Sequence, residues 1–131
     1  MTLESGGDDL VALNDFDKWL FLQLKLQLDS FKHDPRKLDG EERAHYIRWN
    51  ILALLDEIHE ALHETGWKPW ATSRHFNRDN FVDEIVDALH FIGNLLLLTD
   101  VNGEELMRRY ENKQQVNHDR QISSYSGKKN A

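Results

Sequence analysis

Glu57 and Glu60 stand out in this sequence as residues whose type and spacing could do chemistry. They are three residues apart in a stretch where apolar residues recur at helical spacing, so both carboxylates point the same way from one helix. A second such stretch, about residues 79–99, carries a polar stripe among apolar neighbours. The members of this stripe are Asn80, Asp83, Glu84, Asp87, His90 and Asn94. Burying several anions together is very costly unless cations neutralise them, so the two stretches predict an oxygen-ligated metal site.

The ligand types favour Mg²⁺ as the ion, with Mn²⁺ able to replace it. Mg²⁺ prefers carboxylates together with substrate phosphates and retains several of its waters. Zinc is disfavoured because the chain contains no cysteine to act as a thiolate ligand. An alternative stays open from the residues alone. The chain has 23 acidic residues, and an acidic pair spaced by three on a helix usually marks a solvated face.

Four helices are expected to position these residues, at about 9–33, 40–65, 79–99 and 104–120. Apolar residues recur at helical period in each range, and Pro35, Gly66 and Gly103 mark the interruptions between them. Residues 67–78 hold a proline and several aromatics without a sustained period, which is typical of an ordered loop. No strand-like alternation of useful length occurs. The sequence therefore predicts an all-α, four-helix bundle-like fold.

Length and composition predict one domain over residues 1–131, with weakly ordered termini at about 1–8 and 122–131. The 131 residues are 40% hydrophobic, enough for one modest core. A formal net charge of −7 argues against a general nucleic-acid-binding surface. The N-terminus lacks a signal-peptide pattern, and the longest apolar run, Leu95 to Leu98, is too short to span a membrane. We therefore expect no membrane partner and a cytoplasmic location.

A homodimer or higher homo-oligomer is also expected. Apolar residues occupy more than one face of the predicted helices, notably Leu95 to Leu98 and the aromatics of the first helix. One short chain would leave part of that surface uncovered.

Several motifs together resemble those of the dimeric dUTPases. Glu57-Ile-His-Glu60 leads into a Trp67-Lys-Pro-Trp70 loop, and this loop is followed by Asp83-Glu-Ile-Val-Asp-Ala-Leu-His-Phe91. A Gln-containing segment, Leu22 to Gln27, and a C-terminal segment, Tyr110 to Gln121, are similar to that family's nucleobase and phosphate motifs. The resemblance spans about residues 20–125. Gln27, Gln114 and Ser123-Ser124-Tyr125 depart from the family pattern, and the short chain approaches the compact MazG-type members.

The resemblance implies a role for each matching residue. The Mg²⁺ ligands would be Glu57, Glu60, Glu84 and Asp87, and either Glu57 or Glu60 would orient the attacking water. The triphosphate would be held by Lys113, Asn117 and Arg120. The base would be bound by Gln23 and Gln27, the nucleotide bordered by Trp67 and Lys68, and His90 and Asn94 would be further neighbours. The implied reaction is hydrolysis of dUTP to dUMP and pyrophosphate.

Three other functions remain compatible with the sequence. The substrate could be another nucleotide such as dCTP or dGTP, which a turnover assay on all nucleotides would reveal. The chain could instead be a nucleotide-binding regulator without catalysis, which Mg²⁺-dependent hydrolysis would exclude. It could also be a helical interaction module with a solvated acidic stripe, in which case neither Mg²⁺ nor nucleotide would bind.

Overall fold

The computed structural model describes residues 13–130, with side chains described as far as Ser123. Within this range the chain forms four α-helices and one short 3-10 helix, and no strand occurs among the described residues. The elements are α2 (Asp15–Ser30), η1 (Pro35–Lys37), α3 (Gly40–His63), α4 (Arg78–Leu98) and α5 (Gly103–Asn130). The predicted all-α fold is therefore confirmed.

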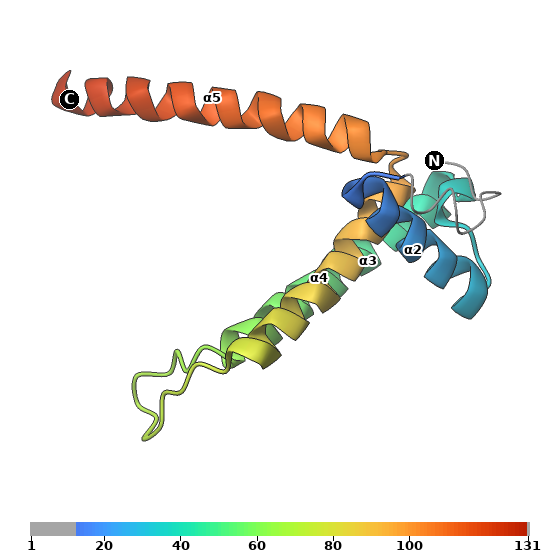
Figure 1. Ribbon diagram of the computed structural model, residues 1–131, viewed down its shortest axis with the longest axis horizontal. Coiled ribbons are helices and arrows are strands. Elements are labelled where there is room, and N and C mark those ends of the chain that lie inside the picture. Colours follow the sequence, from blue (N-terminus) through green and yellow to red (C-terminus); the bar gives the residue numbers. More distant parts are fainter. Residues whose placement is uncertain (1–12, 131) are drawn as a thin grey trace.

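Helices α3 and α4 form a long antiparallel hairpin that supports the candidate site (Figure 1). At one end, Arg43 Nε donates to the Leu98 carbonyl at 2.7 Å. At the other end, the Asn77 amide donates to the Glu64 carbonyl at 2.9 Å and closes the base of the connecting loop. Gly66 enters this loop with φ +62, and a Cβ there would lie 2.7 Å from the Arg74 carbonyl carbon. Glycine is thus required where α3 ends and the loop turns.

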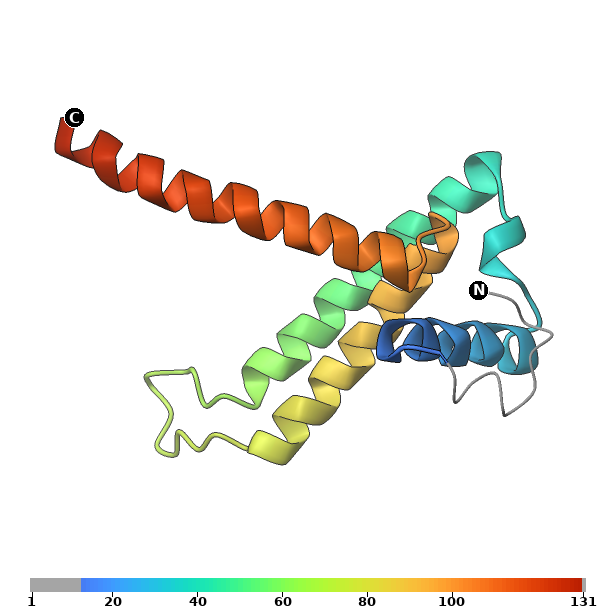
Figure 2. The same cartoon turned by 45° about the horizontal axis from the view of Figure 1, so that its top comes forward.

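Helix α2 lies across the C-terminal part of α4, as the blue and orange ribbons of Figure 2 show. The helices approach closely at Gly93, where a Cβ would lie 3.1 Å from Gln23 Cγ. The small core of the chain forms at this crossing from Leu20, Leu24 and Leu97. Because α4 contacts α3, α2 and η1, it has a central position, which fits the apolar residues around most of its circumference.

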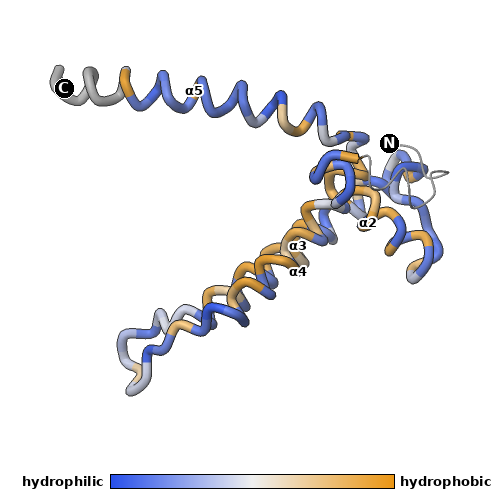
Figure 3. Tube along the Cα trace, viewed as in Figure 1, coloured by the Kyte–Doolittle hydropathy of each residue, from blue (hydrophilic) through white to orange (hydrophobic). Residues whose placement is uncertain are grey.

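Helix α5 leads away from the hairpin, and its contacts with the other described residues lie near its beginning (Figures 1 and 2). The Gly103 amide donates to Asp17 Oδ1 at 2.8 Å and fixes this beginning to α2. Figure 3 shows that the coloured part of α5 is mostly hydrophilic. A packed core therefore does not explain the helix, but residues 104–122 are rich in strong helix formers and contain no proline.

Two predicted helix boundaries are wrong. The first helix begins at Asp15 rather than near residue 9, because the Asn14 side chain accepts from the Asp17 amide and caps the helix there. Helix α5 continues to Asn130, well beyond the predicted end near 120. Residues 1–12, including the predicted weakly ordered segment 1–8 and the predicted helical residues 9–12, lie outside the described part of the chain.

The apolar surface that one chain leaves uncovered agrees only in part with the predicted one. Phe16 and Phe31, two aromatics of the predicted first helix, are exposed as expected. Leu97 and Leu98 are buried in the chain's own core. Among the helices, α3 carries the largest group of exposed apolar residues, which includes Ile51, Leu52, Leu55, Ile58 and Leu62. They form a stripe at helical spacing, which we call the α3 apolar stripe. No helix within the described residues is both long and apolar enough to cross a membrane.

Candidate metal centre and adjoining pocket

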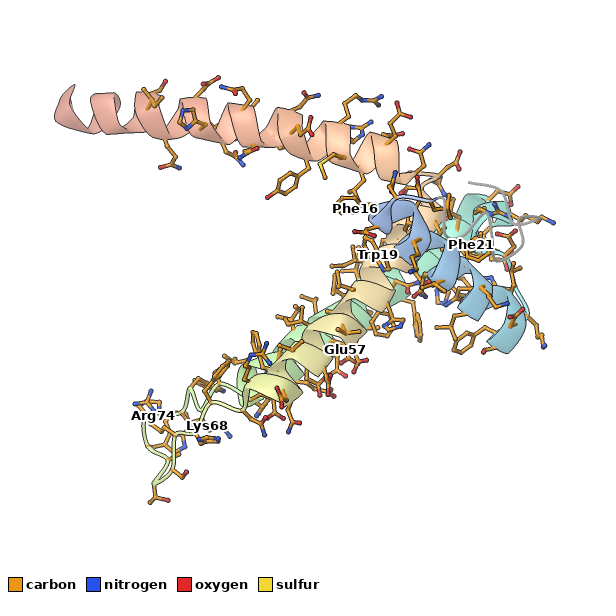
Figure 4. All side chains as sticks on the ribbon, viewed as in Figure 1. Phe16, Trp19, Phe21, Glu57, Lys68 and Arg74 are labelled. Atoms are coloured by element: carbon orange, nitrogen blue, oxygen red, sulfur yellow. The ribbon has the colours of Figure 1, made fainter. Side chains whose placement is uncertain are left out.

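Three carboxylates from the two helices of the hairpin meet at one place. Glu57 and Glu60 come from successive turns of α3, and Glu84 comes from α4; each offers an oxygen within 4.8 Å of the other two. Figure 4 shows Glu57 part of the way along the hairpin, between the α2 crossing and the loop. The antiparallel pairing of α3 and α4 therefore brings together acidic residues that are far apart in sequence.

The environment of these carboxylates penalises their negative charge. Glu57 Oε2 and Glu84 Oε2 are both buried, and neither has a hydrogen-bond partner among the described residues. Removal from water, the largest cause, and the neighbouring carboxyl groups of Glu57 and Glu60 together raise the pKa of Glu84 to about 7. Removal from water also raises the pKa of Glu57, assisted by the charges of Glu60 and Asp87. Buried carboxylate oxygens that lack donors and repel each other fit a divalent cation, which would neutralise and coordinate them.

Asp87 lies one turn after Glu84 on α4 and outside the tight group of three. It lines the pocket next to the cluster together with Glu57. The charge of Asp87 contributes to the raised pKa of Glu57, so the two groups are electrostatically close. The cluster and the pocket together therefore contain four carboxylates, those of Glu57, Glu60, Glu84 and Asp87.

The adjoining pocket has a volume of about 480 Å³ and lies between α2, α3 and α4. Its aromatic lining includes Phe31, His33, Tyr46, Trp49 and Phe91. Trp49 and Phe91 meet edge to face with ring centroids 6.3 Å apart. A concave site with aromatic walls, a few polar groups and carboxylates at its edge is typical of small-molecule binding.

The polar lining of the pocket includes a chain of buried amides. Gln23 Nε2 donates to Asn94 Oδ1 at 2.7 Å, and Asn94 Nδ2 donates to Asn50 Oδ1 at 3.0 Å. Asn50 Nδ2 donates to the Tyr46 carbonyl at 2.8 Å. Gln27 is also buried and lines the pocket. Each of the three helices around the pocket therefore contributes at least one amide.

His90 lines the same pocket from α4. Its Nδ1 lies 2.9 Å from the Val86 carbonyl, which can only accept, so Nδ1 carries the proton. In the neutral ring Nε2 is then the acceptor.

Two of the predicted site residues lie in the loop beyond the hairpin. Trp67 and Trp70 pack edge to face there with centroids 5.7 Å apart. Figure 4 shows Lys68 and Arg74 at the loop end, away from Glu57. Neither Trp67 nor Lys68 lines the pocket, so within one chain the aromatic wall is formed by Trp49 and Phe91 instead.

The predicted phosphate-binding residues Lys113, Asn117 and Arg120 all lie on α5. Lys113 and Asn117 line a separate shallow cleft on that helix. Because α5 leads away from the hairpin, a single chain does not bring them to the carboxylates (Figure 1). Their role stays a prediction.

The sequence reasoning missed Asn50, Tyr46, Trp49 and His33. A signal for Asn50 was present, since it precedes Glu57 by seven residues, which is about two helical turns on the same face. Asn94 follows Asp87 by the same interval on α4. Tyr46 and Trp49 carried no comparable signal, because in sequence they read as ordinary apolar helix residues.

Comparison with known families bears on this arrangement. A family model described as dUTPase matches residues 18–102, which is more than half of the chain. The match covers most of α2 and all of α3 and α4, and it ends before α5. No curated protein and no solved structure shows significant similarity to the chain.

Proposed function

Since this chain belongs to the dUTPase family, we propose that it hydrolyses a deoxynucleoside triphosphate, dUTP foremost, to the monophosphate and pyrophosphate in the presence of Mg²⁺. Membership supports dUTP-type nucleotide hydrolysis in general. The observation that carries the finer proposal is the continuity between the carboxylate cluster and the pocket. Glu57 belongs to both, so a base in the pocket would direct its phosphates towards the cluster.

The four carboxylates are the proposed ligands of the metal. Glu57, Glu60 and Glu84 would provide the closest oxygens, and Asp87 would contribute from the pocket side. When bound, Mg²⁺ supplies positive charge that offsets both the carboxylates and the triphosphate. The orphaned oxygens of Glu57 and Glu84 support this assignment, because no other described residue offers them a hydrogen bond.

We assign the orientation of the attacking water to Glu57, which both lines the pocket and belongs to the cluster. A carboxylate that accepts a hydrogen bond from water can hold that water in line with phosphorus and take its proton. The water oxygen bonds to a phosphorus beside the α–β bridging oxygen. The bond from that phosphorus to the bridging oxygen breaks, and the products are a monophosphate and pyrophosphate.

The base would lie in the aromatic part of the pocket. Trp49 and Phe91 offer ring surfaces, and the amides of Gln23 and Gln27 offer hydrogen bonds. A pocket of this kind discriminates between bases by its buried polar groups. A base that leaves one of these groups without a hydrogen bond binds more weakly.

A second copy of the chain would complete the enzyme. The α3 apolar stripe is uncovered in one chain and would pack against its equivalent in a homodimer. Helix α5 leads away from its own cluster, so it would bring Lys113, Asn117 and Arg120 to the phosphates of the other subunit. The positive charges of Lys113 and Arg120 would offset the charge that develops on the leaving pyrophosphate.

The test is product analysis after incubation with each of the common nucleoside triphosphates, with Mg²⁺ and with excess chelator. The expected result is dUMP and pyrophosphate from dUTP, with no turnover in chelator. Turnover of dCTP or a purine nucleotide at an equal or higher rate would overturn the dUTP assignment and leave the hydrolase assignment in place. Binding without turnover would indicate a regulator.

A further inference from the structure

Two histidines of α3 bring their ring nitrogens close together on the exposed surface of the helix. His59 and His63 are about one turn apart, and their Nε2 atoms lie 3.0 Å from each other. The rings meet edge to face, with centroids 4.6 Å apart and an angle of 81° between their planes. Both residues are exposed, and neither lines the pocket. The proposed hydrolysis therefore makes no use of this pair.

The histidine pair is separate from the carboxylate cluster, although Glu60 lies between the two histidines in sequence. Successive residues leave a helix about 100° apart, which places both histidines between the α3 apolar stripe and Glu60 around the helix. Within the described part of the chain, the only group of three or more converging metal-binding side chains is that of Glu57, Glu60 and Glu84. An ion held by both histidines would therefore take its remaining ligands from water.

The separation of the two nitrogens suits chelation of a transition-metal ion. Bonds from zinc to histidine nitrogen are about 2.0–2.1 Å long, so an ion bonded to two nitrogens 3.0 Å apart makes an angle of about 90° with them. Square-planar and octahedral ions require this angle, and a tetrahedral ion requires the nitrogens to separate by a few tenths of an ångström. Imidazole suits Zn²⁺, Ni²⁺ and Cu²⁺, whereas Mg²⁺ prefers oxygen ligands.

In the metal-free chain a hydrogen bond accounts for the short distance between the rings. One neutral ring donates from Nε2 and the other accepts at Nε2. Chelation needs a lone pair on both Nε2 atoms, and the donating ring gains one when its proton moves to Nδ1. The χ2 torsion of histidine has broad minima, so a small rotation directs both lone pairs at one point. The helix thus already holds both ligands at chelating distance, which keeps the cost of ordering them low.

We propose that His59 and His63 form a binding site for a transition-metal ion, namely Zn²⁺, Ni²⁺ or Cu²⁺, distinct from the Mg²⁺ site. Two histidines spaced by four on one helix face are a known zinc-binding arrangement. Because Glu60 belongs to the carboxylate cluster, the pair is a binding site and not the centre of a zinc peptidase. One helix then carries oxygen ligands for a hard cation and nitrogen ligands for a softer one. The site does not depend on nucleotide hydrolysis.

The experiment measures Zn²⁺ binding by isothermal titration in excess Mg²⁺, which occupies the carboxylate cluster. His59→Gln and His63→Gln each remove one imidazole, and glutamine is a good helix former. Either change should weaken Zn²⁺ binding by roughly a hundredfold, because the ion loses one of its two linked ligands. His45→Gln is the matched control, since His45 is an exposed histidine of the same helix without a second histidine one turn away. It should bind Zn²⁺ as wild type does.

Electron paramagnetic resonance with one equivalent of Cu²⁺ identifies the ligand atoms. Hyperfine coupling should show two imidazole nitrogens in wild type and in His45→Gln, but one in His59→Gln or His63→Gln. Glu57→Gln changes the carboxylate cluster and should retain both nitrogens. In Mg²⁺ alone, His59→Gln and His63→Gln should hydrolyse dUTP at the wild-type rate, because both residues lie outside the cluster and the pocket.

The outcomes separate this site from the proposed function. Equal Zn²⁺ affinity in wild type and both histidine variants would overturn the site. Loss of Zn²⁺ binding in Glu57→Gln alone would also overturn it, because the ion would then belong to the carboxylates. If wild type binds no Zn²⁺ in excess Mg²⁺, the pair is only a hydrogen-bonded contact, whether or not dUTP is hydrolysed. Zn²⁺ binding that needs both histidines, in a protein that hydrolyses no nucleotide, supports the site and overturns the proposed function.

Discussion

Glu57 of α3 and Glu84 of α4 face each other across the helical hairpin, and each buries a carboxylate oxygen that has no hydrogen-bond partner in the described part of the chain. Two anions in this relationship destabilise the folded chain unless a proton or a cation lies between them. The arrangement therefore predicts specific responses to metal, to pH and to substitution.

Removing a carboxylate from the cluster should abolish activity and weaken metal binding. Glu57→Gln or Asp87→Ala is expected to lower kcat/KM by about a thousandfold or more, since the metal's contribution is several kcal/mol. Isothermal titration with Mg²⁺ and Mn²⁺ measures the binding directly. Glu41→Gln changes an exposed glutamate in the first turn of the same helix and serves as the control. Full activity of wild type in excess chelator would contradict the metal assignment.

The stability of the metal-free protein should fall as the pH rises. The pKa of Glu84 is raised from its ordinary value of 4.5 to about 7, so the folded state holds this proton more tightly than the unfolded chain does. The stabilisation is fully present below the unfolded value and is lost as the pH rises through about 7.

Thermal unfolding in chelator, followed between about pH 5 and about pH 8, checks this dependence. Glu84→Gln should flatten the Tm profile and raise the Tm at the alkaline end. A wild-type Tm that rises across this pH range would show that the pKa of Glu84 is not raised in the folded protein. Addition of Mg²⁺ should raise the wild-type Tm most at alkaline pH, where the cluster is ionised.

Trp49 should contribute more to nucleotide binding than Trp67 does. Trp49 lines the pocket beside Phe91, whereas Trp67 packs against Trp70 in the loop. We expect Trp49→Leu to raise the Kd for the non-hydrolysable analogue α,β-imido-dUTP by roughly tenfold, because the base would lose one aromatic ring on which it stacks. Trp67→Leu is the matched control. A larger effect from Trp67 would indicate that the loop closes over a bound nucleotide.

Helix periodicity and local signals were sufficient to predict the four helices and the acidic residues of α3 and α4. Glu57 and Glu84 could be predicted to lie together, because polar residues on apolar helices need a partner. This argument does not depend on the angle between the helices. Asn50 was different. Its contact with Asn94 depends on the register of the hairpin, and the contact of Asn94 with Gln23 depends on how α2 crosses at Gly93. Both are tertiary features that no single helix encodes.

The apolar pattern of α3 illustrates a second limit. Ile51, Ile58 and Leu62 predicted the helix correctly, yet in one chain they face outward, while the carboxylates and Asn50 face α4. Periodicity shows that a helix has an apolar face, but it does not show which surface covers that face. Likewise, the residues of α5 predicted a helix without showing where it points.

The α3 apolar stripe should hold two subunits together. Leu55 is 60% exposed and Ile58 is 47% exposed in one chain, values that packing against a second copy would reduce. We expect Leu55→Glu combined with Ile58→Glu to convert a dimer to a monomer, because two charges would have to be buried. Light scattering after size exclusion measures the mass. Ser substitution at exposed Tyr110 on α5 should leave the mass unchanged, and a monomeric wild type at micromolar concentration would refute the dimer.

The position of α5 leads to the last prediction, which concerns catalysis across the dimer. If Lys113 and Arg120 reach the phosphates of the other subunit, each site combines the carboxylates of one chain with the basic residues of its partner. Glu57→Gln and Arg120→Ala should each be inactive as homodimers. A mixed dimer then contains one site with both changes and one site with neither.

Co-expression of the two variants with different affinity tags yields a random mixture in which half of the dimers are mixed. Such a mixture should regain roughly a quarter of wild-type activity, since one site in two is intact in half of the dimers. Purification through both tags should raise this fraction to about a half. If α5 instead serves its own subunit, every site in the mixed dimer carries one change and activity stays at the level of the single variants. Absence of recovery in dimers that carry both tags would therefore assign the phosphate-binding role, if it exists, to the same chain.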